Sequence, residues 1–60
     1  MKYAVVYMEY LHSQYELITH IEESPLSLRE YAMQLKSEGL ALSDTEIVMP
    51  GAILAVRRIG

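Results

Sequence analysis

Cysteine, tryptophan and phenylalanine are absent from this chain, and only three glycines and two prolines occur among its 60 residues. Without cysteine there is no disulfide framework and no thiolate zinc site, which are the usual stabilising elements of very small domains. A chain of this length buries only about 60% of its unfolded surface, so we expect the monomer to be marginally stable. We therefore expect self-association, most simply as a homodimer, to supply the stability that the monomer lacks.

Positive charge is also scarce, because Lys and Arg number five against eight Asp and Glu, for a formal net charge of −3. Nucleic-acid binding needs clustered basic residues, so this composition argues against it. The longest apolar run covers residues 3–8, far short of the roughly 20 residues that cross a bilayer. Glu9 follows where the apolar region of a secretory signal would continue. We therefore expect a cytoplasmic protein with no membrane partner.

Hydrophobic residues make up 52% of the chain, which together with the low net charge excludes disorder and predicts one domain over residues 1–60. Residues 2–11 and 15–22 are rich in Tyr, Val, Ile and Leu, which predicts two strands around a turn at residues 12–14. In the second strand the odd-numbered side chains are the more apolar set. We expect this set to face the core beside the even-numbered side chains of the first strand, a pairing that a two- or four-residue loop produces.

A helix is predicted after Ser24-Pro25, which ends the second strand. Ser27 and Glu30 match a capping box, in which each side chain accepts a hydrogen bond from an exposed backbone N–H. Gly39 is a typical C-terminal stop. Apolar side chains recur between these caps with helical spacing at Leu28, Tyr31, Ala32 and Leu35.

The tail predicts a last strand over residues 46–59, bent at Pro50-Gly51. A strand–helix–strand crossover makes this strand parallel to the second one, and right-handed crossover places it beside the first. The predicted fold class is therefore α+β, a ββαβ unit with a three-stranded sheet in the order 2-1-3 and one helix on one face. The first strand is then central, in agreement with its apolar character on both faces.

The sheet face without a helix is the predicted contact surface. One helix covers one face of such a sheet, and we assign it the face with Val6, Met8, Leu17 and Ile21. The alternative interpretation of the other face is a solvated surface with a few exposed apolar residues. Tyrosine-rich surfaces are typical of interfaces. The predicted partner-binding residues are Tyr3, Val5, Tyr7, Glu9, Leu11, Ile18 and His20, together with Arg57 and Arg58 of the last strand.

No arrangement typical of an enzyme occurs in the sequence. Asp44 and Glu46 have the spacing of about 7 Å seen in carboxylate pairs of glycosidases, but they follow a turn in a domain too small for a deep cleft. His12 and His20 are roughly 26 Å apart along an extended strand and cannot share a metal ion within one chain. The three glycines form no phosphate-binding loop. We predict a non-enzymatic protein with no catalytic residue, metal or cofactor.

Two resemblances add to these predictions. The hairpin, the helix that opens with SLRE at residues 27–30 and the strand with MPGAILAVR at residues 49–57 resemble the small accessory proteins that bacteriophages use to inhibit host enzymes or defence systems. This resemblance rests on size and element order, and it implies an inhibitor that binds a protein in the host cytoplasm. MKYAVV at residues 1–6 and LREY at residues 28–31 resemble antitoxin domains of the HicB type, which usually carry a Pro-Asp-Leu-Pro-Gly-Cys-like segment that this chain lacks.

Three functions from different classes follow. The first is a protein-binding module, which homodimerises or docks on a protein partner and inhibits it in the phage-type case. The second is a binder of nucleotides or other small anionic ligands, with a site between subunits that uses Arg57 or Arg58. The third is a small enzyme that uses Asp44, Glu46 or a histidine across an interface. The lack of a catalytic arrangement favours the first.

Overall fold

A long hairpin opens the fold in the computed structural model, which describes residues 1–60. It consists of β1 (Lys2–Leu11) and β2 (Gln14–Glu23). The turn residues His12 and Ser13 both have positive φ, 51° and 66°, as in the type I′ turns whose twist matches that of the flanking strands. Met8 lies opposite Leu17 in the hairpin register, so the predicted pairing of even with odd positions is confirmed.

The helix α1 (Leu28–Glu38) has the predicted caps. Ser27 Oγ accepts a hydrogen bond from the Glu30 amide at 3.3 Å, and Glu30 Oε1 accepts one from the Ser27 amide at 3.2 Å. At the other end, the amide of Gly39 donates to the Leu35 carbonyl oxygen at 2.9 Å. Gly39 has φ 80°, a left-handed conformation that turns the chain out of the helix.

The tail is divided into more elements than the sequence predicts. β3 (Leu40–Ser43) and β4 (Glu46–Val48) form an antiparallel hairpin of their own. The bend at Pro50-Gly51 is a short 3-10 turn, η1 (Pro50–Ala52), and it separates β4 from β5 (Ile53–Arg58). Of these tail elements, only β5 therefore joins the sheet that β1 and β2 form.

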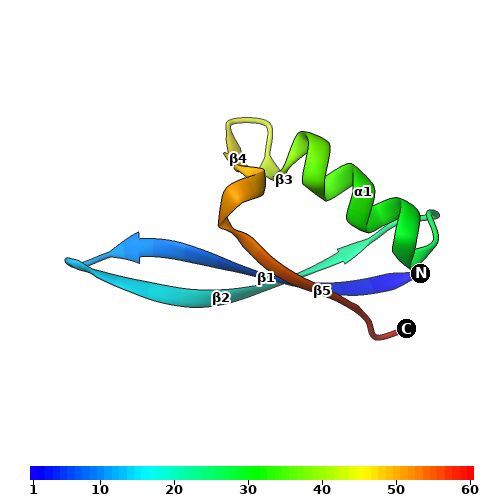
Figure 1. Cartoon of the computed structure of the whole chain (residues 1–60), viewed down its shortest axis with the longest axis horizontal. Coiled ribbons are helices and arrows are strands. Elements are labelled where there is room, and N and C mark those ends of the chain that lie inside the picture. Colours follow the sequence, from blue (N-terminus) through cyan, green and yellow to red (C-terminus); the bar gives the residue numbers. More distant parts are fainter.

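The main sheet has the order β2-β1-β5, which confirms the predicted order 2-1-3. β1 is antiparallel to both neighbours, so β2 and β5 run parallel. In β5, Ala55 lies opposite Val6 and Ile53 opposite Tyr7, which leaves Leu54 as a bulge residue. Figure 1 shows α1 over one end of the sheet, beside both termini, while the tip of the β1–β2 hairpin projects from the other end.

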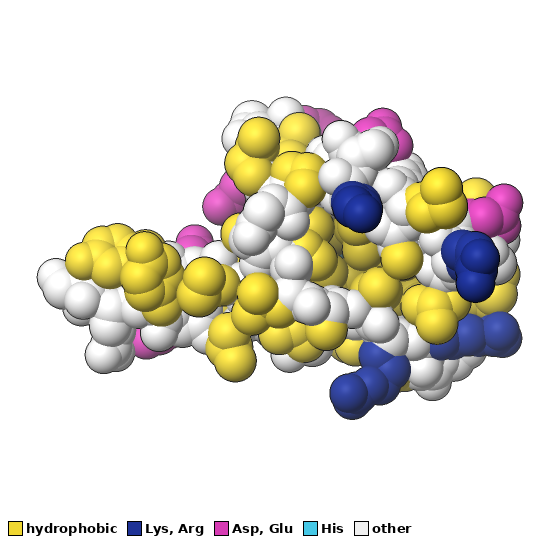
Figure 2. Space-filling view, in the orientation of Figure 1, with side chains coloured by type: hydrophobic (Ala, Val, Ile, Leu, Met, Phe, Trp, Pro, Cys, Tyr) yellow, Lys and Arg dark blue, Asp and Glu magenta, His cyan; other side chains and the backbone are white.

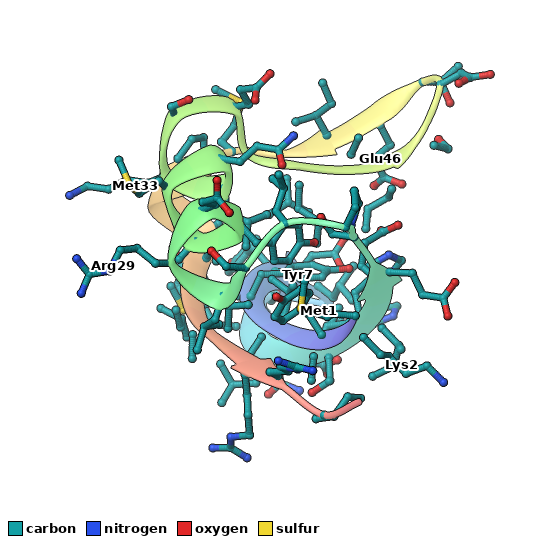
Figure 3. The ribbon with its side chains drawn as sticks, turned by 90° about the vertical axis from the view of Figure 1, so that its right-hand side faces the viewer. Met1, Lys2, Tyr7, Arg29, Met33 and Glu46 are labelled. Carbon is teal, nitrogen blue, oxygen red and sulfur yellow. The ribbon has the colours of Figure 1, made fainter.

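The core lies between β1 and α1. Tyr3 is its centre, because its ring stacks on that of Tyr31 with centroids 4.7 Å apart and its hydroxyl donates to the Leu26 carbonyl oxygen at 2.6 Å. Figure 3, in which the hairpin is seen end on, shows Tyr7 enclosed by the strands and the helix. The buried side chains are Tyr3, Val5, Tyr7, Tyr31, Leu35 and Leu40.

The predicted orientation of the sheet is therefore wrong, since the helix covers the face with Tyr3, Val5 and Tyr7 rather than the face with Met8 and Leu17. The orientation is deduced from the polarity of β2. α1, however, packs against β5 and the end of β1. The polarity of β2 therefore does not report which face the helix covers. The side chains of β1 and β5 determine which face is covered.

Candidate functional site

All of the predicted partner-binding residues except Arg57 fall on the covered side of the sheet. Tyr3 and Val5 are fully buried and Tyr7 is 6% exposed, so these three cannot contact a partner in the folded monomer. This part of the prediction is wrong, because the side chains form the core against α1. Burial raises the pKa of the Tyr7 hydroxyl, and the nearby carboxylates of Glu9 and Glu46 raise it further.

The remaining predicted residues differ in exposure. Half-buried side chains on the covered side are Glu9, Leu11, Ile18 and His20. Ile18 packs against the core, and His20 Nε2 lies 2.8 Å from Glu22 Oε2. Arg57 and Arg58 are exposed and lie on opposite faces, since their partners in β1 are Ala4 and Tyr3. The predicted partner-binding residues therefore do not form one continuous surface.

The uncovered side of the sheet, which we call the outer face, carries most of the exposed apolar area of the hairpin. Its centre contains no charged side chain, because Lys2, Glu23 and Arg57 lie only at the end near the chain termini. Among the large side chains, Leu17 is 68% exposed and Ile21 is 50% exposed. The residues of the outer face are Ala4, Val6, Met8, Tyr10, Tyr15, Leu17, Thr19, Ile21 and Ala55.

An aromatic pair lies on the outer face at the tip of the hairpin. The rings of Tyr10 and Tyr15 are 5.0 Å apart at an angle of 59°, and both side chains are more than 60% exposed. Figure 2 shows hydrophobic side chains gathered along the upper side of the projecting hairpin, with other side chains and backbone at its tip and underside. Tyrosine supplies a large contact area at a small loss of side-chain entropy, which suits it to binding another protein.

The sequence signal for the outer face is the apolar set of β2, which consists of Tyr15, Leu17, Thr19 and Ile21. We interpret this set as core in the sequence, and in the structure it faces solvent. The opposite face of β2, with Glu16 and His20, is the more polar one and lies on the helix side of the sheet. Hydrophobicity alone does not separate a core face from an interface, because both are apolar.

A hollow of about 340 Å³ lies between α1, β3 and the end of β2. Glu22, Glu23 and Glu38 are among its lining side chains, so its charge is negative and unsuited to an anionic ligand. Tyr31 also lines it; its hydroxyl has no hydrogen-bond partner, and burial, then the charge of Glu22, raises its pKa. No group of three or more His, Asp or Glu side chains is arranged to hold a metal ion.

The carboxylates of Asp44 and Glu46 lie in and beside the β3–β4 turn, where both side chains are exposed. Figure 3 shows Glu46 below the β3–β4 hairpin, on the side of β1, where it lines a hollow of about 270 Å³ together with Tyr7 and Glu9. Carboxylates that act as general acid or base are usually held in a cleft that shifts their pKa. Asp44 lines no hollow of the protein, and Glu46 lines one while remaining exposed, so the two carboxylates do not face each other across a cleft.

Fold and surface together define the class of this protein as a small α+β domain with one covered and one apolar, uncovered sheet face. Comparison with protein-family models, with curated proteins and with solved structures finds no match. The resemblances to phage inhibitors and to HicB-type antitoxins therefore stay predictions. No helix has the length and apolar character that crossing a bilayer requires.

Proposed function

We propose that this protein is a non-enzymatic protein-binding module, that the outer face is its contact surface, and that a second copy of the chain is the first partner of that face. The observation that carries this proposal is the inverted polarity of β2. Leu17 and Ile21 face solvent, whereas the polar side chains of the same strand lie on the side of the helix. Monomeric proteins rarely expose a contiguous apolar patch of this kind, and where one occurs it marks a binding site.

The size of the outer face supports a dimer. Its five large apolar side chains expose roughly 550 Å² per protomer, if each has a full surface of about 200 Å². Two copies that cover this surface on each other would bury about 1,100 Å², which is at the lower end of specific interfaces. An interface of this size is typical of a reversible dimer. The side chains are Met8, Tyr10, Tyr15, Leu17 and Ile21.

Charge also favours a second copy. The uncharged centre of the outer face brings no like charges together when two identical faces meet, and sheets pack face to face at about 10 Å with interdigitated side chains. Lys2, Glu23 and Arg57 then lie at the rim, where charged groups keep their solvent. The core of the monomer is small, because only six of its 60 residues are buried, and dimerisation would add to the buried apolar area.

Sedimentation equilibrium of the wild type and of Leu17→Ser tests the proposal. Burying a leucine contributes about 1.5–3 kcal/mol when it is fully exposed beforehand. Leu17 is 68% exposed, so its loss from both copies should cost about 2–4 kcal/mol and weaken the dimer roughly 30- to 1,000-fold. Because the side chain is exposed in the monomer, the melting temperature of dilute protein should change little.

Ile47→Ser is the matched control. Ile47 is 57% exposed, lies in β4 and is not part of the outer face. Its replacement should leave the dissociation constant of the dimer within about twofold of wild type. A wild type that stays monomeric at about 0.5 mM, or a Leu17→Ser dimer as stable as the wild type, would show that the outer face does not bind a second copy.

A further inference from the structure

A second apolar surface lies between α1 and β5. Two adjoining hollows of about 500 and 310 Å³ share Ala32, Lys36 and Val56, so they form one continuous groove between the helix and the strand. Exposed apolar side chains at its margins are Leu28, Met33 and Leu54. In Figure 2 this groove is the hydrophobic strip among the basic side chains on the right-hand part of the molecule.

The groove has a charge opposite to that of the whole protein. Arg29 and Lys36 line it, and no acidic side chain does. Neither cation takes part in a salt bridge, since the one ion pair of the protein joins His20 and Glu22. Figure 3 shows Arg29 and Met33 projecting from the same side of α1, above β5. In a chain with a net charge of −3, this is a surface that attracts carboxylates.

β5 offers backbone hydrogen-bonding groups beside the groove. β1 is its only neighbouring strand, so β5 is an edge of the sheet. None of the backbone hydrogen bonds outside the helices and strands joins β5 to α1. The bulge at Leu54 leaves residues 55–58 as the straight part of this edge, which is long enough to pair with a short extended segment.

We propose that the groove binds an extended, acidic segment of a partner protein, which adds to the sheet as a fourth strand beside β5. Backbone pairing along residues 55–58 supplies affinity, while side chains of the added strand contact the apolar floor at Ala32 and Val56. Carboxylates of the segment pair with Arg29 and Lys36. This site is separate from the dimer proposed above, so either proposal can fail without the other.

Fluorescence anisotropy with a labelled, capped octapeptide tests this site; its odd positions are valine and glutamate in turn and its even positions are threonine, so that both the apolar and the acidic side chains fall on one face of the strand. We expect saturable binding with a Kd below about 100 µM, and binding at least 10-fold weaker when every glutamate is replaced by lysine. Alternate amides of a strand point to opposite sides. N-methylation of one alternate set should therefore abolish binding, whereas N-methylation of the other set should change the Kd less than about threefold.

Matched variants locate the site. Arg29→Gln combined with Lys36→Gln should weaken binding of the valine–glutamate peptide at least about 10-fold, because both charges at the groove are lost. Lys2→Gln removes a cation that Figure 3 shows on the opposite side of the molecule, and it should change the Kd less than about twofold. These side chains are exposed, so the variants should fold.

Three outcomes would overturn the proposal. Equal binding of the two N-methylated peptides would exclude strand addition, and equal binding of the lysine peptide would exclude recognition of acidic segments. The third outcome is no peptide binding at about 1 mM together with weaker self-association of the Arg29→Gln and Lys36→Gln double variant. That result would assign the groove to a second copy of this chain.

Discussion

Replacing Gly39 by alanine adds a single methyl group at the point where α1 turns into β3. Gly39 has φ 80° and ψ −170°, a region of backbone conformation that is essentially restricted to glycine. Holding another residue type there costs about 1–3 kcal/mol. The backbone conformation alone therefore makes Gly39→Ala destabilising.

The surroundings of Gly39 add a steric term. A Cβ atom at this position would overlap the carbonyl oxygen of Val48 and lie 3.3 Å from Ile47 Cγ2 and from Pro50 Cδ. The Val48 oxygen belongs to backbone, so the overlap is relieved only if β4 moves away from the end of α1. Overpacking of this kind costs about 1–3 kcal/mol, which brings the expected loss to roughly 2–6 kcal/mol.

A single core of this size rarely supplies more than about 3–5 kcal/mol of stability, so Gly39→Ala should leave much of the protein unfolded at about 37 °C. Thermal unfolding followed by circular dichroism measures this, at one protein concentration for all variants because dimerisation shifts the melting temperature. Gly51→Ala is the control: a Cβ there meets no heavy atom within 4 Å, and the variant should be neutral or slightly more stable. A Gly39→Ala melting temperature within about 3 °C of wild type would refute this account of the helix end.

Three further predictions concern single hydroxyl groups and the hairpin turn. Tyr31→Phe removes a buried hydroxyl without a partner, so it should raise the free energy of unfolding by about 1 kcal/mol, whereas Tyr3→Phe removes a hydrogen bond and should lower it by a similar amount. Because burial raises the pKa of Tyr31, the wild type should lose stability as the pH rises above about 10, and urea titrations at pH 7 and pH 11 should show a smaller loss for Tyr31→Phe. Ser27→Ala should cost about 1 kcal/mol at neutral pH. The Ser27 hydrogen bonds lower the pKa of Glu30, so the stability that they provide is present above the pKa of an unfolded glutamate, and this difference from wild type should shrink in thermal melts near pH 3. Ser13→Gly places glycine at φ 66° and should raise the melting temperature by a few degrees.

The features that the sequence predicts correctly depend on neighbouring residues. The capping box of Ser27 and Glu30 and the stop at Gly39 are local hydrogen-bond patterns, so three or four residues specify them. The register of the β1–β2 hairpin follows from the turn length and the alternation of two adjacent strands. The order of the main sheet follows from the crossover through α1.

The features that the sequence does not predict depend on residues far apart. The covered face of the sheet is decided by which strands lie beneath α1, and the alternation within β2 carries no information about that. β3 and β4 are only four and three residues long, and they pair after the backbone reverses at Gly39. Their pattern in the sequence is too short to separate them from one bent strand.

The two proposed surfaces contain most of the large apolar side chains that this chain leaves exposed. Hydrophobic residues make up 52% of the sequence, yet twelve large apolar side chains are exposed. Five of these twelve lie on the outer face, and Leu28, Met33 and Leu54 lie at the groove between α1 and β5. The outer face is uncharged at its centre and suits an identical partner, whereas the groove is basic and suits an acidic one. If both proposals hold, Leu17→Ser should weaken the dimer and leave the affinity for the valine–glutamate peptide unchanged, because the two surfaces bind through different side chains.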